Sequence, residues 1–214
     1  MRVGIAGYGV VGKTRHRSIE SNTSYQVTAI SESSEKARKS IPEGIDVYND
    51  FKTLIANAEL DVIFISLPNQ FAAEAACLSL QNGLHVFCEK PPARTHAELL
   101  EVEKQSLKFP ELKLMYGFNH RFHLSVEEAK LLIDGNSLGR LINMKGVYGK
   151  SQMISFNQTD WRTDREASGG GILLDQGIHM LDLMRYLSGE NFTDVFSIID
   201  NAFWNFDVED NAYV

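Results

Sequence analysis

Three side chains that lie far apart along the chain carry chemistry for moving a proton and stabilising a negative charge. Lys90 closely follows an apolar run over residues 84–88, and an ammonium group held at a strand end can stabilise an oxygen that gains alkoxide character. Asp175 precedes His179 by four positions, so on a helix its carboxylate can orient the imidazole for general acid/base work. Such a pair is also common in helix capping and at surfaces, and that alternative stays open.

A glycine-rich turn near the start of the chain predicts a dinucleotide site. Gly7, Gly9 and Gly12 follow an apolar run over residues 3–6 and begin a helix expected to reach Ser18. In this spacing the glycines allow a tight turn, the approach of a pyrophosphate and close helix–strand packing, while N–H groups at the helix start meet the phosphate charge. A purely structural turn is the alternative. The loop residues predicted to contact the cofactor are Gly7, Tyr8, Gly9, Val10, Val11 and Gly12.

The residues after the second predicted strand, 27–30, bear on the choice between NAD and NADP. NAD enzymes usually place an acid about 20 residues after the glycine loop. Ser31 stands at that position, and the two-residue period of a strand would turn Glu32 the other way. Serine leaves room for a 2′-phosphate within reach of Lys36 or Arg38, whereas Glu32 would repel it. The cofactor is NAD or NADP, with a slight preference for NADP, unless both residues merely begin the next turn.

The elements that must position these residues alternate between strand and helix in the first half of the chain. The continuous apolar run over 62–66 is typical of a strand buried on both faces. Asp50 is a candidate N-cap, and Thr95 with Glu98 forms a capping box. Strands are expected over 3–6, 27–30, 47–48, 62–66, 84–88 and 112–118, and helices include 34–40, 51–56 and 72–81. This order predicts an α/β fold with a doubly wound parallel sheet.

The pattern changes near residue 118, where a domain boundary is expected. The later elements are predicted as a helix over 126–133, a strand over 141–149, a polar loop over 151–171, a helix over 173–187 and strands over 192–199 and 208–214. The last strand reaches the chain end without a turn or cap, as though a sheet were incomplete.

Composition argues against several partners. The 214 residues carry a net charge of −7, which disfavours nucleic acid or an anionic membrane as the main partner. The two cysteines, Cys77 and Cys88, imply no disulfide framework. A strand begins directly after Met1, and no apolar run nears the roughly 20 residues of a membrane span. We therefore expect a cytoplasmic protein without a signal peptide.

Further motifs occur in a fixed order and together carry a family resemblance. In chain order they are Gly7-x-Gly9-x-x-Gly12, Glu89-Lys90-Pro91, Gly117-Phe118-Asn119-His120-Arg121, Trp161-Arg162, and Gly169-Gly170-Gly171 with Asp175 and His179. Over essentially its whole length, the sequence resembles the glucose–fructose oxidoreductase and inositol dehydrogenase family, also called Gfo/Idh/MocA. The Glu-Lys-Pro motif combined with the later Asp-x-x-x-His is the most specific element of this resemblance.

The resemblance implies a dinucleotide-binding Rossmann domain over 1–118 and a partial substrate-binding α/β domain over 119–214, with an open, mainly antiparallel sheet. It implies that Lys90 holds and polarises a substrate oxygen, that His179 exchanges the hydroxyl proton, and that Asp175 orients the substrate or the histidine. A cis peptide bond is implied after Lys90. Further cofactor contacts are expected from Ser31, Glu32, Leu67, Pro68, Asn69, Glu89, Lys90 and Asn119.

The candidate substrate contacts are Arg121, Trp161 and Arg162. Arg121 could instead form a surface ion pair, and Trp161 with Arg162 could simply cover a sheet edge. His120 and His123 are expected to face solvent or to be structural. No metal site is predicted, because no further His or Cys cluster accompanies the Asp–His pair.

Two departures from the family pattern affect these expectations. Residues 68–72 lack a histidine that family members often carry there, so no catalytic role is assigned to them. Family chains usually run well beyond this length, so we expect a fragment or an unusually short second domain. An unpaired apolar sheet edge would favour a homo-oligomer formed through the C-terminal sheet.

The sequence therefore predicts an NAD(P)-dependent oxidoreductase. Such an enzyme would transfer a hydride between nicotinamide and a secondary hydroxyl or ketone of a small sugar, cyclitol or sugar nucleotide. The alternatives are a dinucleotide-binding regulator or inactive partner subunit, and a reductase or dehydratase for another substrate class on the same scaffold.

Overall fold

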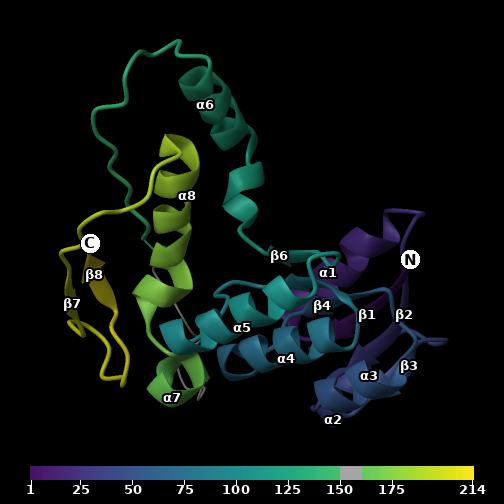
Figure 1. Cartoon of the computed structure of the whole chain (residues 1–214). Coiled ribbons are helices and arrows are strands. Elements are labelled where there is room, and N and C mark those ends of the chain that lie inside the picture. The colour runs from purple at the N-terminus through teal and green to yellow at the C-terminus, as the bar shows by residue number, and fades with distance from the viewer. Residues whose placement is uncertain (150–160) are drawn as a thin grey trace. The chain divides into compact units, whose positions relative to one another are not determined.

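The computed structural model describes residues 1–149 and 161–214, and the chain divides into two compact units, Met1–Gly117 and Phe118–Val214 (Figure 1). The first unit is a parallel sheet with its helices, and the described part of the second is mainly helical with a small antiparallel sheet. No helix in these ranges is long and apolar enough to cross a membrane.

Strand and helix alternate through the first unit, as the sequence pattern predicted. The strands are β1 (Arg2–Ala6), β2 (Gln26–Ser31), β3 (Asp46–Tyr48), β4 (Val62–Ile65), β5 (His85–Cys88) and β6 (Leu114–Tyr116). The helices are α1 (Val10–Glu20), α2 (Glu35–Arg38), α3 (Phe51–Asn57), α4 (Asn69–Gln81) and α5 (His96–Lys108). The parallel strands follow the order β3-β2-β1-β4-β5-β6, which confirms the doubly wound sheet.

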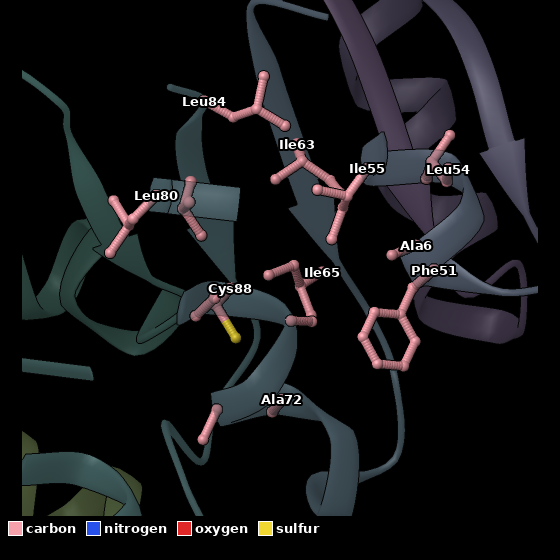
Figure 2. Packing of buried hydrophobic residues seen from close by; sticks show 14 of the residues in the cluster. Ala6, Phe51, Leu54, Ile55, Ile63, Ile65, Ala72, Leu80, Leu84 and Cys88 are labelled. Atoms are coloured by element: carbon pink, nitrogen blue, oxygen red, sulfur yellow. The ribbon is translucent and has the colours of Figure 1, made fainter. Parts of the chain in front are cut away.

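The core of this unit lies between the central strands and the helices that pack on them (Figure 2). Ile63 and Ile65 of β4 are at most 1% exposed, as are Leu54 of α3 and Leu80 of α4. A strand covered on both faces must be apolar along its whole length, which is why its sequence run is continuous. The core fixes β4 and β5, and these strands carry site residues at their ends.

Side chains at two helix starts explain where those helices begin. Asp50 accepts a hydrogen bond from the Thr53 N–H (2.8 Å), and the Thr95 hydroxyl accepts one from the Glu98 N–H (3.2 Å). Both predicted N-caps are therefore confirmed.

The second unit begins with a short 3-10 helix and ends with a two-stranded sheet. Its described elements are η1 (Asn119–Phe122), α6 (Leu124–Asp134), η2 (Trp161–Thr163), α7 (Arg165–Ser168), the π-helix η3 (Leu173–Gly177), α8 (Ile178–Ser188), β7 (Ile198–Asp200) and β8 (Asn211–Tyr213). β7 and β8 pair antiparallel.

Several strand predictions for the second unit were wrong in extent. Residues 141–149 form no strand, and Ile142 and Val147 are 92% and 82% exposed. The runs over 192–199 and 208–214 are strands only within β7 and β8. β-branched residues favour a strand where neighbouring side chains and a partner strand complete it, and the 141–149 segment pairs with no other described strand. The predicted loop over 151–171 contains η2 and α7, while its residues 151–160 lie outside the described ranges.

Candidate functional site

The carboxyl ends of five neighbouring strands in the first unit are level with one another. The residues in register there, from β2 to β6, are Ser31, Ala6, Ile65, Cys88 and Tyr116. The residues that follow these strand ends share one edge of the sheet, and they are Glu32, Gly7, Ser66, Glu89 and Gly117. The strand order reverses direction between β1 and β4, and in open parallel sheets ligands bind beyond the strand ends at such a switch point.

The three glycines of the loop at this edge meet different structural requirements. Gly7 has a φ of +88°, and a Cβ on it would lie 2.5 Å from the Ser66 carbonyl oxygen. A Cβ on Gly12 would lie 2.0 Å from the Gly7 carbonyl oxygen, whereas a Cβ on Gly9 would meet no atom within 4 Å. The fold itself requires glycine at the first and third positions. At Gly9 the open space instead fits a ligand that approaches the backbone.

The start of α1 presents backbone N–H groups beside this open space. Gly9 is the N-cap and makes no side-chain cap hydrogen bond, and the first turn contains no acidic residue. Val10 is 85% exposed and Val11 is 42% exposed. Because a helix N-terminus carries partial positive charge, this geometry suits a pyrophosphate. The residues present therefore fit the predicted dinucleotide.

Glu32, rather than Ser31, reaches the glycine loop. The Glu32 carboxylate accepts hydrogen bonds from the N–H groups of Tyr8 (2.9 Å) and Ser34 (2.7 Å). β2 ends at Ser31, so the alternation that would have turned Glu32 away stops there. Ser31 is 2% exposed and offers no room for a phosphate. The slight preference for NADP is therefore not supported.

The side chain of Tyr8 is held inside the fold. It is 4% exposed, and its hydroxyl lies 2.6 Å from Nδ1 of His16. His16 is itself buried, with Nε2 3.3 Å from a Glu20 oxygen. Burial, followed by the charge of Glu20, raises the pKa of the Tyr8 hydroxyl. Tyr8 therefore faces the loop with its backbone alone, a feature that the sequence pattern did not reveal.

Glu89 and Lys90 stand at the end of β5, at the same edge. The Arg15 Nε of α1 donates to Glu89 Oε1 (2.6 Å), and the Arg15 guanidinium lies over the Phe87 ring at 4.9 Å. This pair ties the helix after the glycine loop to the strand end that carries the half-buried Lys90. The Lys90–Pro91 peptide bond is cis, as the resemblance implied. Sequence reasoning did not identify Arg15, which no motif marks.

The segment after β4 completes this edge. A Cβ built on Gly7 would lie 3.3 Å from Leu67 Cδ2, so Leu67 packs against the glycine loop. Pro68 is the N-cap of α4, and Asn69 opens that helix and is 8% exposed. Cys88, in the adjacent strand, is buried, and burial raises the pKa of its thiol far above the ordinary value. That thiol is therefore a packing group.

In the second unit, Asp175 and His179 belong to one continuous helical segment formed by η3 and α8. His179 is 5% exposed, and the buried Gln176 donates its Nε2 to an Asp175 carboxylate oxygen (2.6 Å). The sequence prediction assumed a regular α-helix here, whereas η3 is a π-helix. Short π-helical turns are rare and frequent at functional sites, and periodicity does not reveal them.

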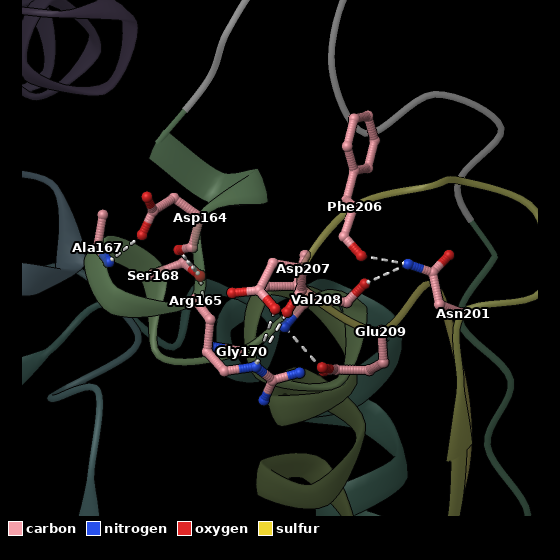
Figure 3. Close-up of polar contacts among 11 residues, drawn as sticks. Asp164, Arg165, Ala167, Ser168, Gly170, Asn201, Phe206, Asp207, Val208 and Glu209 are labelled. Carbon is pink, nitrogen blue, oxygen red and sulfur yellow. Dashed lines mark hydrogen bonds and ion pairs between the residues drawn. The ribbon is translucent and has the colours of Figure 1, made fainter.

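A buried carboxylate caps the start of this segment. Glu209 Oε1 accepts hydrogen bonds from the N–H groups of Gly171 (2.8 Å) and Leu173 (3.3 Å), and the Glu209 carbonyl accepts one from Ile172 (2.9 Å). A Cβ on Gly171 would lie 1.9 Å from that carbonyl oxygen. Figure 3 shows Glu209 beside the contact between Arg165 Nε and the Asp207 carbonyl (2.9 Å). The glycine triplet is therefore a close-approach site for the backbone just before β8, 38 residues later.

The imidazole of His179 lies in a stack of rings. Its centroid is 4.0 Å from that of His120 with an interplanar angle of 19°, and the His120 ring is stacked on Tyr148 at 5.7 Å. Phe118 meets His179 edge-on at 6.2 Å. His120 is half-buried and contributes an aromatic face to the predicted acid/base residue. No pattern in the sequence around His120 predicted that its ring would stack on His179.

The candidate substrate contacts have partners within the second unit. Arg121 forms a two-pronged ion pair with Asp182, with Nε donating at 2.8 Å, and the Asp182 hydrogen bond raises the pKa of the Arg121 guanidinium. The Arg162 guanidinium lies over the Trp161 ring at 4.5 Å. The ion-pair alternative for Arg121 is thus observed, and its role toward a substrate stays a prediction. Asn119, predicted to contact the cofactor, is exposed at the start of η1. Within the described ranges, no group of three or more His, Cys, Asp or Glu side chains could hold a metal ion.

The fold and the first unit's loop define a class of protein, a doubly wound α/β protein with a dinucleotide-type glycine loop at the switch point of its sheet. The chain belongs to the GFO/IDH/MocA oxidoreductase family. Residues 1–116 match its NAD-binding Rossmann-fold domain, and residues 126–214 match a GFO/IDH/MocA C-terminal domain.

Relatives and solved structures of the family are similar to nearly the whole chain. The D-glucoside 3-dehydrogenase of Escherichia coli K12 is 30% identical over 95% of this chain and 58% of its own length. A levoglucosan dehydrogenase in complex with NADH and levoglucosan has a TM-score of 0.88 and 26% identity, over 99% of this chain and 62% of its own. The myo-inositol 2-dehydrogenase of Lactobacillus plantarum has a TM-score of 0.83 and 28% identity, over 94% and 60%. The chain spans about three fifths of the length of these proteins.

Proposed function

We propose that this protein is an NAD(P)-dependent dehydrogenase or reductase acting on a secondary hydroxyl or ketone of a sugar, cyclitol or sugar nucleotide. The observation that carries the proposal is the level sheet edge in the first unit, where the open Gly9, the start of α1 and Lys90 all stand at or beside strand ends. Family membership and the named sugar and cyclitol dehydrogenases among the relatives support the substrate class.

The proposed roles follow from the chemistry of each side chain. Lys90, held at the end of β5, stabilises negative charge on the substrate oxygen. His179 takes the hydroxyl proton in the oxidative direction and returns it in the reductive direction, and Asp175 orients the substrate or the imidazole. A bound nicotinamide supplies the hydride acceptor or donor. We assign cofactor binding to residues 1–118 and substrate binding to residues 119–214.

We further propose that NAD is the preferred cofactor. Glu32 places a carboxylate against the glycine loop through the Tyr8 N–H. At the end of the second strand, an acid can accept hydrogen bonds from the ribose hydroxyls of NAD, and its charge repels the 2′-phosphate of NADP. This reverses the earlier inference from Ser31, which lies buried beneath the edge.

The proposal is tested by cofactor binding followed by turnover. NADH and NADPH are titrated by fluorescence, and then sugars, cyclitols and sugar nucleotides are screened by absorbance of the reduced cofactor. Lys90→Ala should abolish turnover and leave cofactor affinity within a few-fold, because its ammonium group acts on the substrate oxygen. Lys104→Ala, which removes an exposed lysine of α5 paired with Glu101, is the matched control and should change neither.

Two outcomes would contradict this reading. Turnover that survives Lys90→Ala removes the lysine from the chemistry. Tight cofactor binding without turnover of any screened substrate instead favours the dinucleotide-binding regulator.

A further inference from the structure

His120 and His179 form a close pair of titratable rings within the second unit. Their centroids are 4.0 Å apart and their planes differ by 19°, so the rings lie face to face. Tyr148 lies on the same stack, 5.7 Å from His120 at an angle of 9° and 6.3 Å from His179 at 20°. His179 is 5% exposed, and the rings of Phe118, His120 and Tyr148 lie near its imidazole.

This arrangement restricts both the position and the protonation of His179. Stacked rings hold each other's planes, which limits rotation of the imidazole about its side-chain bonds. Two imidazolium ions at this separation repel each other strongly in a partly buried setting. From this geometry we expect the two imidazoles to titrate as coupled sites, with the second proton added only at lower pH than the first.

Other charged groups lie on the elements packed around this pair. Besides Tyr148, the other titratable or charged groups on the described elements around the pair belong to η1, α6, η3 and α8, and they are Arg121, His123, Glu127, Glu128, Lys130, Asp134, Asp175, Asp182, Arg185 and Tyr186. Arg121 is paired with Asp182, and Lys130 with Asp134. His123 meets His120 edge-on at 5.2 Å. The His120 ring lies closer to the His179 ring than that of Tyr148 does, with centroid distances of 4.0 Å and 6.3 Å.

We propose that His120 is a positioning residue for His179, holding the imidazole plane and disfavouring its protonated form. The proposal rests on the proposed function in one respect, namely that a neutral His179 is the base in the oxidative direction. Lowering the proton occupancy of His179 extends the pH range over which it can take the hydroxyl proton. The face-to-face ring stack lowers the proton occupancy of His179 without any direct contact between His120 and a substrate.

The first test follows the imidazole signals of the full chain by NMR as pH changes, and it needs no turnover. In the wild type, His120 and His179 should titrate in two shared steps, the signature of coupled sites. In His120→Phe, which keeps a ring but removes the second titrating group, His179 should titrate in one step. Its midpoint should rise by about one pH unit, a tenfold change in proton affinity. His123→Phe is the matched control and should leave that midpoint nearly unchanged.

The second test measures the pH profile of kcat/KM in the oxidative direction. The acidic limb should move to higher pH in His120→Phe, and His120→Ala should in addition lower kcat more than it changes KM. Independent single-step titrations in the wild type, or an unmoved His179 midpoint in His120→Phe, would overturn the proposal even if turnover were lost. If the two histidines titrate as coupled sites but the protein has no dehydrogenase activity, the coupling of His120 and His179 stands and the proposed function is rejected.

Discussion

At the scale of single residues, the glycine loop separates what the fold requires from what a ligand requires. A Cβ would collide with backbone at Gly12 but would meet open space at Gly9. The spacing in the sequence identified all three glycines and gave them plausible roles. It could not separate these two requirements, because the difference depends on which atoms surround each glycine in three dimensions.

Alanine substitutions at Gly12 and Gly9 should therefore affect different properties, stability in the first case and cofactor binding in the second. Gly12→Ala should destabilise the protein by roughly 1–3 kcal/mol, because backbone must move to admit the methyl group. Gly9→Ala should leave the melting temperature nearly unchanged and weaken NADH binding, since its methyl group projects into the space assigned to the pyrophosphate. Thermal denaturation and NADH fluorescence titration on the two variants measure both effects. Equal NADH affinity in Gly9→Ala and the wild type would contradict the site.

Glu32 provides the residue-scale test of cofactor choice. Glu32→Ser should weaken NADH binding and strengthen NADPH binding, lowering the preference for NADH at least about tenfold, since one unit charge beside a phosphate is removed. Glu35→Ser changes a neighbouring acid in α2 and serves as the control. The ratio of the two dissociation constants is the measured quantity. An unchanged ratio in Glu32→Ser would place the ribose elsewhere.

At the scale of elements, the sequence predicted the first unit far better than the second. In the first unit the central strands β1, β2, β4 and β5 contain buried residues, so apolar runs and turn residues coincide with the elements they predict. In the second unit, the run over 141–149 has strand-forming residues but no paired strand among the described residues. The π-helix at Leu173–Gly177 was missed for another reason, because it arises from tertiary contacts at its start rather than from a residue pattern.

The cap supplied by Glu209 is the clearest of those contacts and can be tested directly. Glu209→Ala should lower the free energy of unfolding by about 1–3 kcal/mol, because the buried N–H group of Gly171 and the part-buried N–H group of Leu173 lose an acceptor. Glu209→Gln keeps an acceptor oxygen and should lose less. Urea denaturation measures both variants, and hydrogen exchange at Gly171 and Leu173 locates the effect. Equal losses in the two variants would mean that packing, rather than the cap, stabilises this segment.

At the scale of the whole molecule, the prediction of a homo-oligomer rests on exposed apolar side chains of the small sheet. Ile198 and Ile199 are adjacent in β7 and point to opposite faces, yet they are 60% and 51% exposed. Sedimentation velocity should show association that increases with concentration, and Ile199→Lys should weaken it by placing a charge in the contact. Leu107→Lys alters an apolar residue of α5 that is 75% exposed, and it should have no effect. A wild type that stays monomeric at all concentrations would contradict the prediction.

The distance in sequence between Glu209 and Gly171 has a consequence for biosynthesis. The ribosome releases a chain from its N-terminus. The segment that carries Asp175 and His179 therefore emerges before Glu209, whose carboxylate caps the start of that segment and which lies 38 residues after Gly171. The first unit has no such dependence, since its glycine loop, β4 and β5 are finished within residues 1–117. Nascent chains halted before position 209 should therefore fold the first unit, while the helical segment that carries Asp175 and His179 still lacks the carboxylate that caps its start.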